Sequence, residues 1–306
     1  MNLVNVLNLQ IMMFTIMAVG AFLRKKEIVT SRDKRVLTDL VINLVLPCNI
    51  IMSFHMEFSR EILEQGLMII TISCVIQVMC MVFSKVLFNH FPKEQKMILQ
   101  YGTICSNAGF LGNPVAEGIY GPLGLLYASV YLIPQRIVMW SAGISFFTEA
   151  PDRKTLVKKV LTHPCIVAVF LGVGMMISQI PVPTVILQSV DTIGKCTTAL
   201  TMLLIGVILA EADARTIISK TTMGFAVLRL VLIPGVVFLG CKVVGVPELI
   251  GGLSVILAAM PAGTTTAILA VKYNGDEEFA TKCVVLTTLL SVVMIPVWCT
   301  LIQMWY

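Results

Sequence analysis

Residues 97–118 read MILQYGTICSNAGFLGNPVAEG, and residues 248–275 read ELIGGLSVILAAMPAGTTTAILAVKYNG. Both stretches are largely apolar, but Gly, Pro, Asn or Thr residues gather in their middles. Proline lacks the backbone donor that a helix needs, and glycine costs backbone entropy in a helix. Each stretch is therefore predicted to be a helix that breaks near its centre.

The whole chain is too apolar for a water-soluble fold. Of its 306 residues, 57% are hydrophobic and only 13% are charged, and the mean hydropathy is +0.92. Soluble domains contain about 25% charged residues. A helix that crosses a membrane needs about 20 predominantly apolar residues, and on that basis we predict an all-α integral membrane protein with ten transmembrane helices. The two broken stretches are the fourth and the ninth of these.

Basic residues gather in alternate connections between the predicted spans. The even-numbered connections hold only Arg60, Lys195 and Lys242, whereas most other Lys and Arg residues lie in the odd-numbered ones. Cytoplasmic loops are enriched in Lys and Arg, so the odd-numbered connections are predicted to be cytoplasmic. Both termini are then expected to lie outside a plasma membrane of the bacterial type. The net charge of +5 follows from these loops and requires no nucleic-acid partner.

The sequence has none of the common motifs of enzymes and metal sites. The nine cysteines form no C-x-x-C pair and are read as small apolar residues. The chain has no G-x-x-x-x-G-K-[ST] nucleotide loop, no H-E-x-x-H and no G-x-S-x-G, the motifs of common nucleotide, zinc and hydrolase sites. We therefore expect no enzymatic activity, no metal and no cofactor.

The basic stretch 150–160 divides the predicted spans into two sets of five. Residues 1–149 form the first five-helix repeat, 150–160 a cytoplasmic linker and 161–306 the second repeat. Because five is an odd number, the second half enters the membrane from the opposite side, which is the geometry of an inverted repeat. Transporters of this kind bind substrate near the midplane, between discontinuous helices at corresponding positions of the two halves.

Polar residues gather where the two helices are expected to break. At about 1.5 Å per residue, the breaks fall near the middle of a hydrocarbon core about 30 Å thick. Freed backbone groups there need partners or must line a cavity, and a half-helix N-terminus suits a carboxylate. Alternatively, Pro and Gly only kink the helices, while Asn and Thr join neighbouring helices. The candidate substrate-binding residues are Ser106, Asn107, Gly109, Asn113, Pro114, Pro261, Gly263, Thr264, Thr265 and Thr266.

Two ionisable residues within the predicted spans are further candidates. Arg136 lies about midway along the fifth span, directly after Pro134, and intramembrane arginines usually face a cavity or a partner. Its guanidinium either attracts a substrate carboxylate or pairs with Glu117 or with carbonyls freed by the proline. Glu117 is a candidate for proton coupling if it is partly buried, and otherwise an ordinary interfacial carboxylate.

Two motifs carry a resemblance to a known family. SNAGFLGNPV (106–115) and AAMPAGTTTAILAVKYNGDEEFATK (258–282), together with the ten predicted spans, resemble the auxin efflux carrier family. That family includes plant PIN-FORMED auxin exporters and bacterial malonate or malate permeases, and it is similar in fold to bile acid sodium symporters. Homodimers are known in it. The resemblance implies a crossover of two broken helices at two prolines, with two asparagines near an organic anion: Pro114 and Pro261, and Asn107 and Asn113.

The function expected from these features is secondary transport of a small organic anion by alternating access. The substrate would be a mono- or dicarboxylate such as malonate, malate or an auxin-like acid, with Arg136 favouring anions. Proton coupling, sodium coupling and uncoupled facilitation all remain open, because a crossover rich in carbonyl, Asn and Thr oxygens suits each of them. A ligand-binding membrane sensor is the alternative from another class. The long cytoplasmic loop of many plant members is missing, which argues against regulation by its phosphorylation.

Overall fold

The computed structural model describes residues 3–57, 59–147, 153–210, 216–273 and 275–305. Residues 150–152 of the predicted linker lie outside this part of the chain. The described residues form α-helices and short π-helical turns (η): α1 (Leu3–Lys25), α2 (Ser31–Leu40), η1 (Val41–Val45), α3 (Leu46–Ser53), α4 (Arg60–Leu87), α5 (Lys93–Ile104), η2 (Ala108–Gly112), α6 (Asn113–Val138), η3 (Met139–Gly143), α7 (Arg153–Leu161), α8 (Pro164–Ser178), α9 (Thr184–Lys195), α10 (Thr197–Leu209), α11 (Lys220–Val227), η4 (Leu228–Leu232), α12 (Ile233–Val244), α13 (Glu248–Ala258), α14 (Thr265–Lys272) and α15 (Glu277–Trp305).

Several of these helices have the length and composition of membrane spans, as the hydropathy predicts. Within the described ranges, six helical stretches are long and apolar enough to cross a membrane: Val6–Lys25, Arg32–Ser53, Arg60–Leu87, Thr184–Leu209, Lys220–Val244 and Glu277–Trp305. Two shorter apolar helices are α8 and α13. The chain is therefore that of an all-α membrane protein, while the count of ten spans and the inverted repeats stay predictions.

A glycine separates the two helical arms of α6. Gly121 has φ 66° and ψ −158°, a conformation that glycine adopts without the steric cost of a side chain. Pro122 follows directly and pre-sets the first turn of the next arm. The kink falls between residues 97–118, the predicted fourth span, and residues 125–147, the predicted fifth span.

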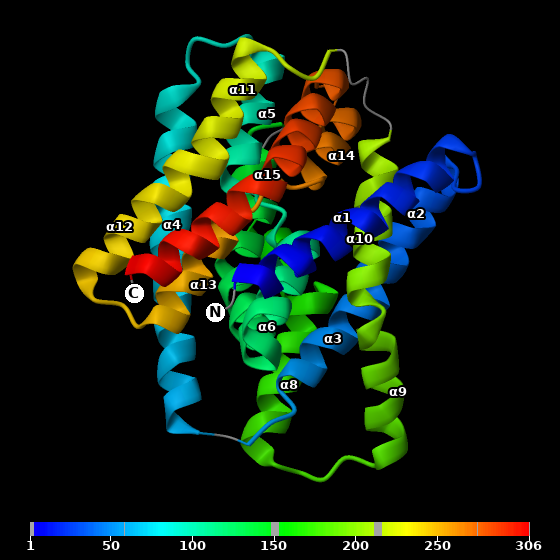
Figure 1. Ribbon diagram of the computed structural model, residues 1–306, viewed down its shortest axis with the longest axis vertical. Coiled ribbons are helices and arrows are strands. Elements are labelled where there is room, and N and C mark those ends of the chain that lie inside the picture. Colours follow the sequence, from blue (N-terminus) through cyan, green and yellow to red (C-terminus); the bar gives the residue numbers. More distant parts are fainter. Residues whose placement is uncertain (1–2, 58, 148–152, 211–215, 274, 306) are drawn as a thin grey trace.

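The helices pack into two groups. The flanking group contains α1, α2, α3, α8, α9 and α10, in which α1 packs on α10 and α3 packs on both α8 and α9. The crossing group contains α4, α5, α6 and α11 to α15, in which α4 packs on α5 and α6, and α14 on α15. In Figure 1 the flanking group occupies the right and lower parts of the view, and the crossing group the left and upper parts.

Two glycines bring α1 and α10 into backbone contact. A Cβ atom added at Gly20 would clash with the backbone of Leu203, and one added at Gly206 would clash with the backbone of Met17. Lipid tails are as apolar as the side chains, so helices in a bilayer associate through close packing at small residues. These glycines therefore allow the close packing of α1 on α10.

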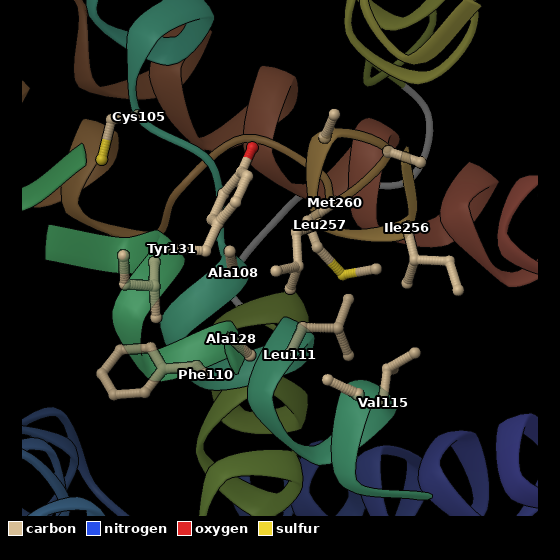
Figure 2. Close-up of a cluster of buried hydrophobic side chains, with 14 of the residues drawn as sticks. Cys105, Ala108, Phe110, Leu111, Val115, Ala128, Tyr131, Ile256, Leu257 and Met260 are labelled. Atoms are coloured by element: carbon tan, nitrogen blue, oxygen red, sulfur yellow. The ribbon is translucent and has the colours of Figure 1, made fainter. Parts of the chain in front are cut away.

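Apolar side chains pack where the two broken helices meet. Figure 2 shows Leu111 and Val115, from η2 and α6, facing Leu257 at the end of α13 and Met260 just after it. All four are fully buried. A Cβ atom at Gly112 would lie 3.0 Å from the Leu257 side chain, so the glycine lets η2 approach Leu257 closely.

Candidate functional site

The two broken helices cross and pair through their backbones. After α5 and α13 end, segments 105–107 and 261–263 form an isolated antiparallel β-bridge between Ser106 and Ala262. The bridge places the unwound backbone of both helices inside the protein, where each supplies partners for the other. Its two hydrogen bonds, each of 2.8 Å, run from Asn107 N–H to the Pro261 carbonyl and from Gly263 N–H to the Cys105 carbonyl.

Two side chains from neighbouring helices complete the hydrogen bonding at the bridge. Gln135 of α6 accepts a bond from Ser106 Oγ at 2.8 Å and donates one to the Ser106 carbonyl at 2.8 Å. Thr287 of α15 accepts the N–H of Ala262 at 3.2 Å. All of these residues are buried. Backbone groups freed at the breaks thus find hydrogen-bond partners on other parts of the protein, as unwound backbone within a membrane protein requires.

A hydroxyl network joins the crossing to α14. The Tyr101 hydroxyl donates to Thr265 Oγ1 at 3.2 Å, and Cys105 Sγ lies 3.4 Å from the same oxygen. Gly263 permits this approach, because a Cβ atom there would lie 3.1 Å from the Cys105 sulfur. Thr265 is therefore the shared partner of two buried groups on the other broken helix.

Replacing Thr265 with valine is expected to lower the free energy of unfolding by about 1–3 kcal/mol, because the buried Tyr101 hydroxyl loses its acceptor. Thermal unfolding in detergent measures this, with Thr265→Ser as the control that keeps the oxygen. Equal stability of the valine and serine variants would contradict the hydrogen-bond assignment.

A cavity of about 110 Å³ lies beside the crossing. It is smaller than the roughly 300–1,000 Å³ of pockets for drug-sized ligands, so it suits a molecule of few heavy atoms. Residues of both helix groups line it: Ile42, Leu46, Cys105, Ser106, Asn107, Gly109, Phe110, Leu132, Gln135, Arg136, Met139, His163, Cys165, Gly263, Thr264 and Thr265.

Two hydrogen-bond donors at this cavity lack partners. Nη1 of Arg136 and Nδ2 of Asn107 are buried, and neither has a hydrogen-bond partner among the described residues. Arg136 is 7% exposed and Asn107 is 3% exposed. The described lining contains no Asp or Glu. The lining residues therefore contribute two unpartnered donors and one positive charge, without a carboxylate among the described lining residues, which is an environment for an anion.

Five predicted site residues do not line the cavity: Asn113, Pro114, Pro261, Thr266 and Glu117. Pro261 takes part through its carbonyl in the bridge. The Glu117 carboxylate accepts a hydrogen bond from Asn49 Nδ2 at 3.2 Å. Both amide atoms of Asn113 are buried without a partner among the described residues. Of the alternatives for Arg136, pairing with Glu117 is not found in the described structure.

The expectation that Pro114 marks the crossover is wrong. The bridge forms at Ser106, whereas Pro114 is the second residue of α6. The π-helical turn η2 runs directly into α6, because Gly112 and Asn113 both have helical dihedral angles, so Pro114 lies beyond the break in a continuous helix. In this half the break is thus stabilised by tertiary pairing upstream of the proline.

Sequence reasoning missed Gln135 and His163. Gln135 bonds the hydroxyl and the carbonyl of Ser106, although its sequence context shows only a polar residue next to an arginine. His163 falls at a predicted membrane interface, yet it lines the cavity together with Arg136. An uncommon polar residue one position before an intramembrane arginine is the signal that favours Gln135. No sequence signal places His163.

A second, larger cavity of about 440 Å³ contains none of the predicted site residues. It lies between the ends of α3 and α8 and the start of α9, with Met56, Met176 and Gln179 among its lining residues. All three helices belong to the flanking group, so this cavity does not lie between the two groups. The smaller cavity at the crossing is therefore the candidate site.

Comparison with known proteins agrees with this architecture. An uncharacterized transporter of Methanothermobacter thermautotrophicus is 27% identical over 63% of this chain and 63% of its own length, so the match spans less than two thirds of that relative. An uncharacterized transporter of Methanocaldococcus jannaschii is 22% identical over 92% of this chain and 93% of its own length. A Rhizobium meliloti protein named "Putative malonate transporter" is 24% identical over 61% of each chain.

A family model described as "Membrane transport protein" matches residues 6–158 and 152–299. These two matches cover nearly the whole chain, and the names of the relatives indicate a transporter rather than an enzyme. The resemblance carried by the motifs at 106–115 and 258–282 is thereby confirmed. The chain belongs to the membrane transport protein family, which is the auxin efflux carrier family.

Proposed function

We propose that this membrane transporter is a secondary carrier of a small organic anion, which binds in the cavity at the crossing. The observation that carries the proposal is the pair of buried, unpartnered donors, Arg136 Nη1 and Asn107 Nδ2, in a cavity whose described lining has no acid. A carboxylate would accept from both donors and neutralise the guanidinium charge.

The position of the cavity supports alternating access. Leu46 and Cys165 belong to the flanking group, whereas Ser106 and Arg136 belong to the crossing group, and all four line the cavity. Rocking of one group against the other around this site would expose the anion first to one side of a plasma membrane and then to the other. The proposal includes two inverted five-helix repeats, both termini outside and the option of a homodimer.

Uptake into proteoliposomes tests the proposal. A panel of labelled mono- and dicarboxylates, including malonate, malate, lactate and an auxin-like acid, is offered to the unmodified protein and to Asn107→Ala and Arg136→Ala. We expect saturable uptake of at least one acid and a decrease of about tenfold or more in each variant, because a charge-assisted hydrogen bond contributes about 1.5–3 kcal/mol.

Arg60→Ala is the matched control, since the side chain of Arg60 is 90% exposed, pairs with Glu64 and does not line the cavity. It should transport normally. If Asn107→Ala and Arg136→Ala both fold and transport normally, the site assignment is wrong. If well-folded protein takes up no acid of the panel, the substrate is of another class or the protein is a ligand-binding sensor.

The coupling mode is tested by the same assay. Uptake is measured with and without sodium and then with the pH gradient collapsed. Loss of uptake without sodium would indicate a sodium symporter, and no dependence on either ion would indicate a facilitator. Glu117→Gln tests the proton-coupling candidate of the sequence, whose carboxylate lies at Asn49 and not in the cavity.

A further inference from the structure

His163 lies where the flanking group contributes to the cavity. It precedes Pro164, the first residue of α8, and it lines the cavity together with Arg136 of α6. A helix N-terminus favours negative charge through its unpaired N–H groups and its dipole. The start of α8, Arg136 and Asn107 therefore line the same small cavity.

The imidazole of His163 accepts a hydrogen bond from the first turn of α8. The first N–H groups of a helix lack intrahelical partners. Here Pro164 has no N–H, and the N–H groups of Ile166 and Val167 both reach the carbonyl of His163. The remaining one, that of Cys165, donates to Nδ1 of the imidazole at 3.3 Å. A ring nitrogen that accepts a hydrogen bond carries no proton, so the imidazole is uncharged in this arrangement.

We propose that His163 takes up a proton together with the anion and so couples the two. The proton comes from the solution and binds covalently to Nδ1. All other changes are in hydrogen bonds. Nδ1 then becomes a donor, and the N–H of Cys165 is released. The anion therefore gains an imidazolium and a backbone donor beside Arg136. This inference rests on the proposed function and assigns the coupling role to His163 instead of Glu117.

The charges around His163 fit this coupling. The other ionisable side chains among the described lining residues are Arg136 of α6, Cys105 at the crossing and Cys165 of α8. Lys154 and Lys158 of α7 are exposed. In the empty cavity an imidazolium would be repelled by the guanidinium, whereas a bound carboxylate attracts both cations. Anion binding and proton binding therefore favour each other.

Titration calorimetry of the full-length protein in detergent tests the inference. Malonate is titrated at pH 7 in two buffers with different heats of ionisation. We expect the binding heat to depend on the buffer, with an uptake of up to one proton per anion. In His163→Gln, whose amide oxygen can still accept the N–H of Cys165 but takes up no proton, this uptake should vanish while malonate still binds.

His90→Gln is the matched control, because His90 is exposed and does not line the cavity, and it should keep the proton uptake. His163→Asn is a second variant in case the glutamine does not fit. Proton uptake that persists in a folded His163 variant, or binding to the unmodified protein without proton uptake, would overturn the inference and leave the proposed function standing. Absence of both binding and transport for every acid of the panel would overturn the proposed function itself.

Discussion

Replacing Gly206 with alanine is expected to destabilise the protein by about 3 kcal/mol or more. The added Cβ would overlap the backbone of Met17, and backbone in the middle of α1 cannot move aside as a flexible side chain can. Overpacking of a well-packed core costs typically about 1–3 kcal/mol. A clash with backbone is expected to cost as much as the upper end of this range or more. The midpoint of thermal unfolding in detergent measures the effect.

Gly174→Ala and Gly224→Ala are the matched controls for this substitution. Both glycines lie inside helices, and a Cβ atom at either would meet nothing within 4 Å. Alanine is favoured over glycine in a helix by up to about 1 kcal/mol, so these variants should be as stable as the unmodified protein or more stable. If Gly206→Ala unfolds at the same temperature as these controls, α1 and α10 do not pack as described.

Replacing Gln135 with leucine is expected to cost about 2–6 kcal/mol, since it leaves the carbonyl and the hydroxyl of Ser106 buried without partners, at about 1–3 kcal/mol each. Both bonds measure 2.8 Å, and Ser106 is 6% exposed. Unfolding in denaturant measures the loss. If Gln135→Leu folds, anion uptake should also fall, because the backbone that carries Asn107 is no longer held.

Gln100 offers a control of the same residue type. It is buried on α5 and donates one bond of 3.0 Å to the Ser84 carbonyl, away from the bridge. Gln100→Leu removes a single bond and is expected to cost about 1 kcal/mol with uptake unchanged. If Gln135→Leu loses less unfolding free energy than Gln100→Leu, the two hydrogen bonds from Gln135 to Ser106 do not stabilise the crossing.

The breaks themselves are predictable from the sequence, because Gly and Pro act locally. Pro261 predicts the interruption between α13 and α14, and the helix does end nearby, at Ala258. Pro114 misleads for the same local reason, since a proline where a helix breaks and a proline within a continuing helix look alike in sequence. Only the pairing of Ser106 with Ala262, far away in sequence, shows where this helix breaks.

The site is less predictable than the fold. Arg136 and Asn107 are expected from the sequence, Arg136 because an intramembrane charge usually faces a cavity or a partner, and Asn107 because polar residues gather at the predicted helix break. His163 is not, because its place at the cavity depends on how α8 packs against α3 and α6. Contacts between side chains on separate helices follow from tertiary packing, which the order of residues along one helix does not encode.

The bridge between Ser106 and Ala262 also sets the order of events during biosynthesis. Its two strands are separated by roughly half of the chain, and ribosomes add about 5–20 residues per second. Segment 105–107 therefore emerges on the order of ten seconds before its partner and waits in the bilayer with its backbone unpaired. During that interval the N–H of Asn107 and the carbonyl of Cys105 lack their partners in the bridge, and closure of the bridge is a late step of folding.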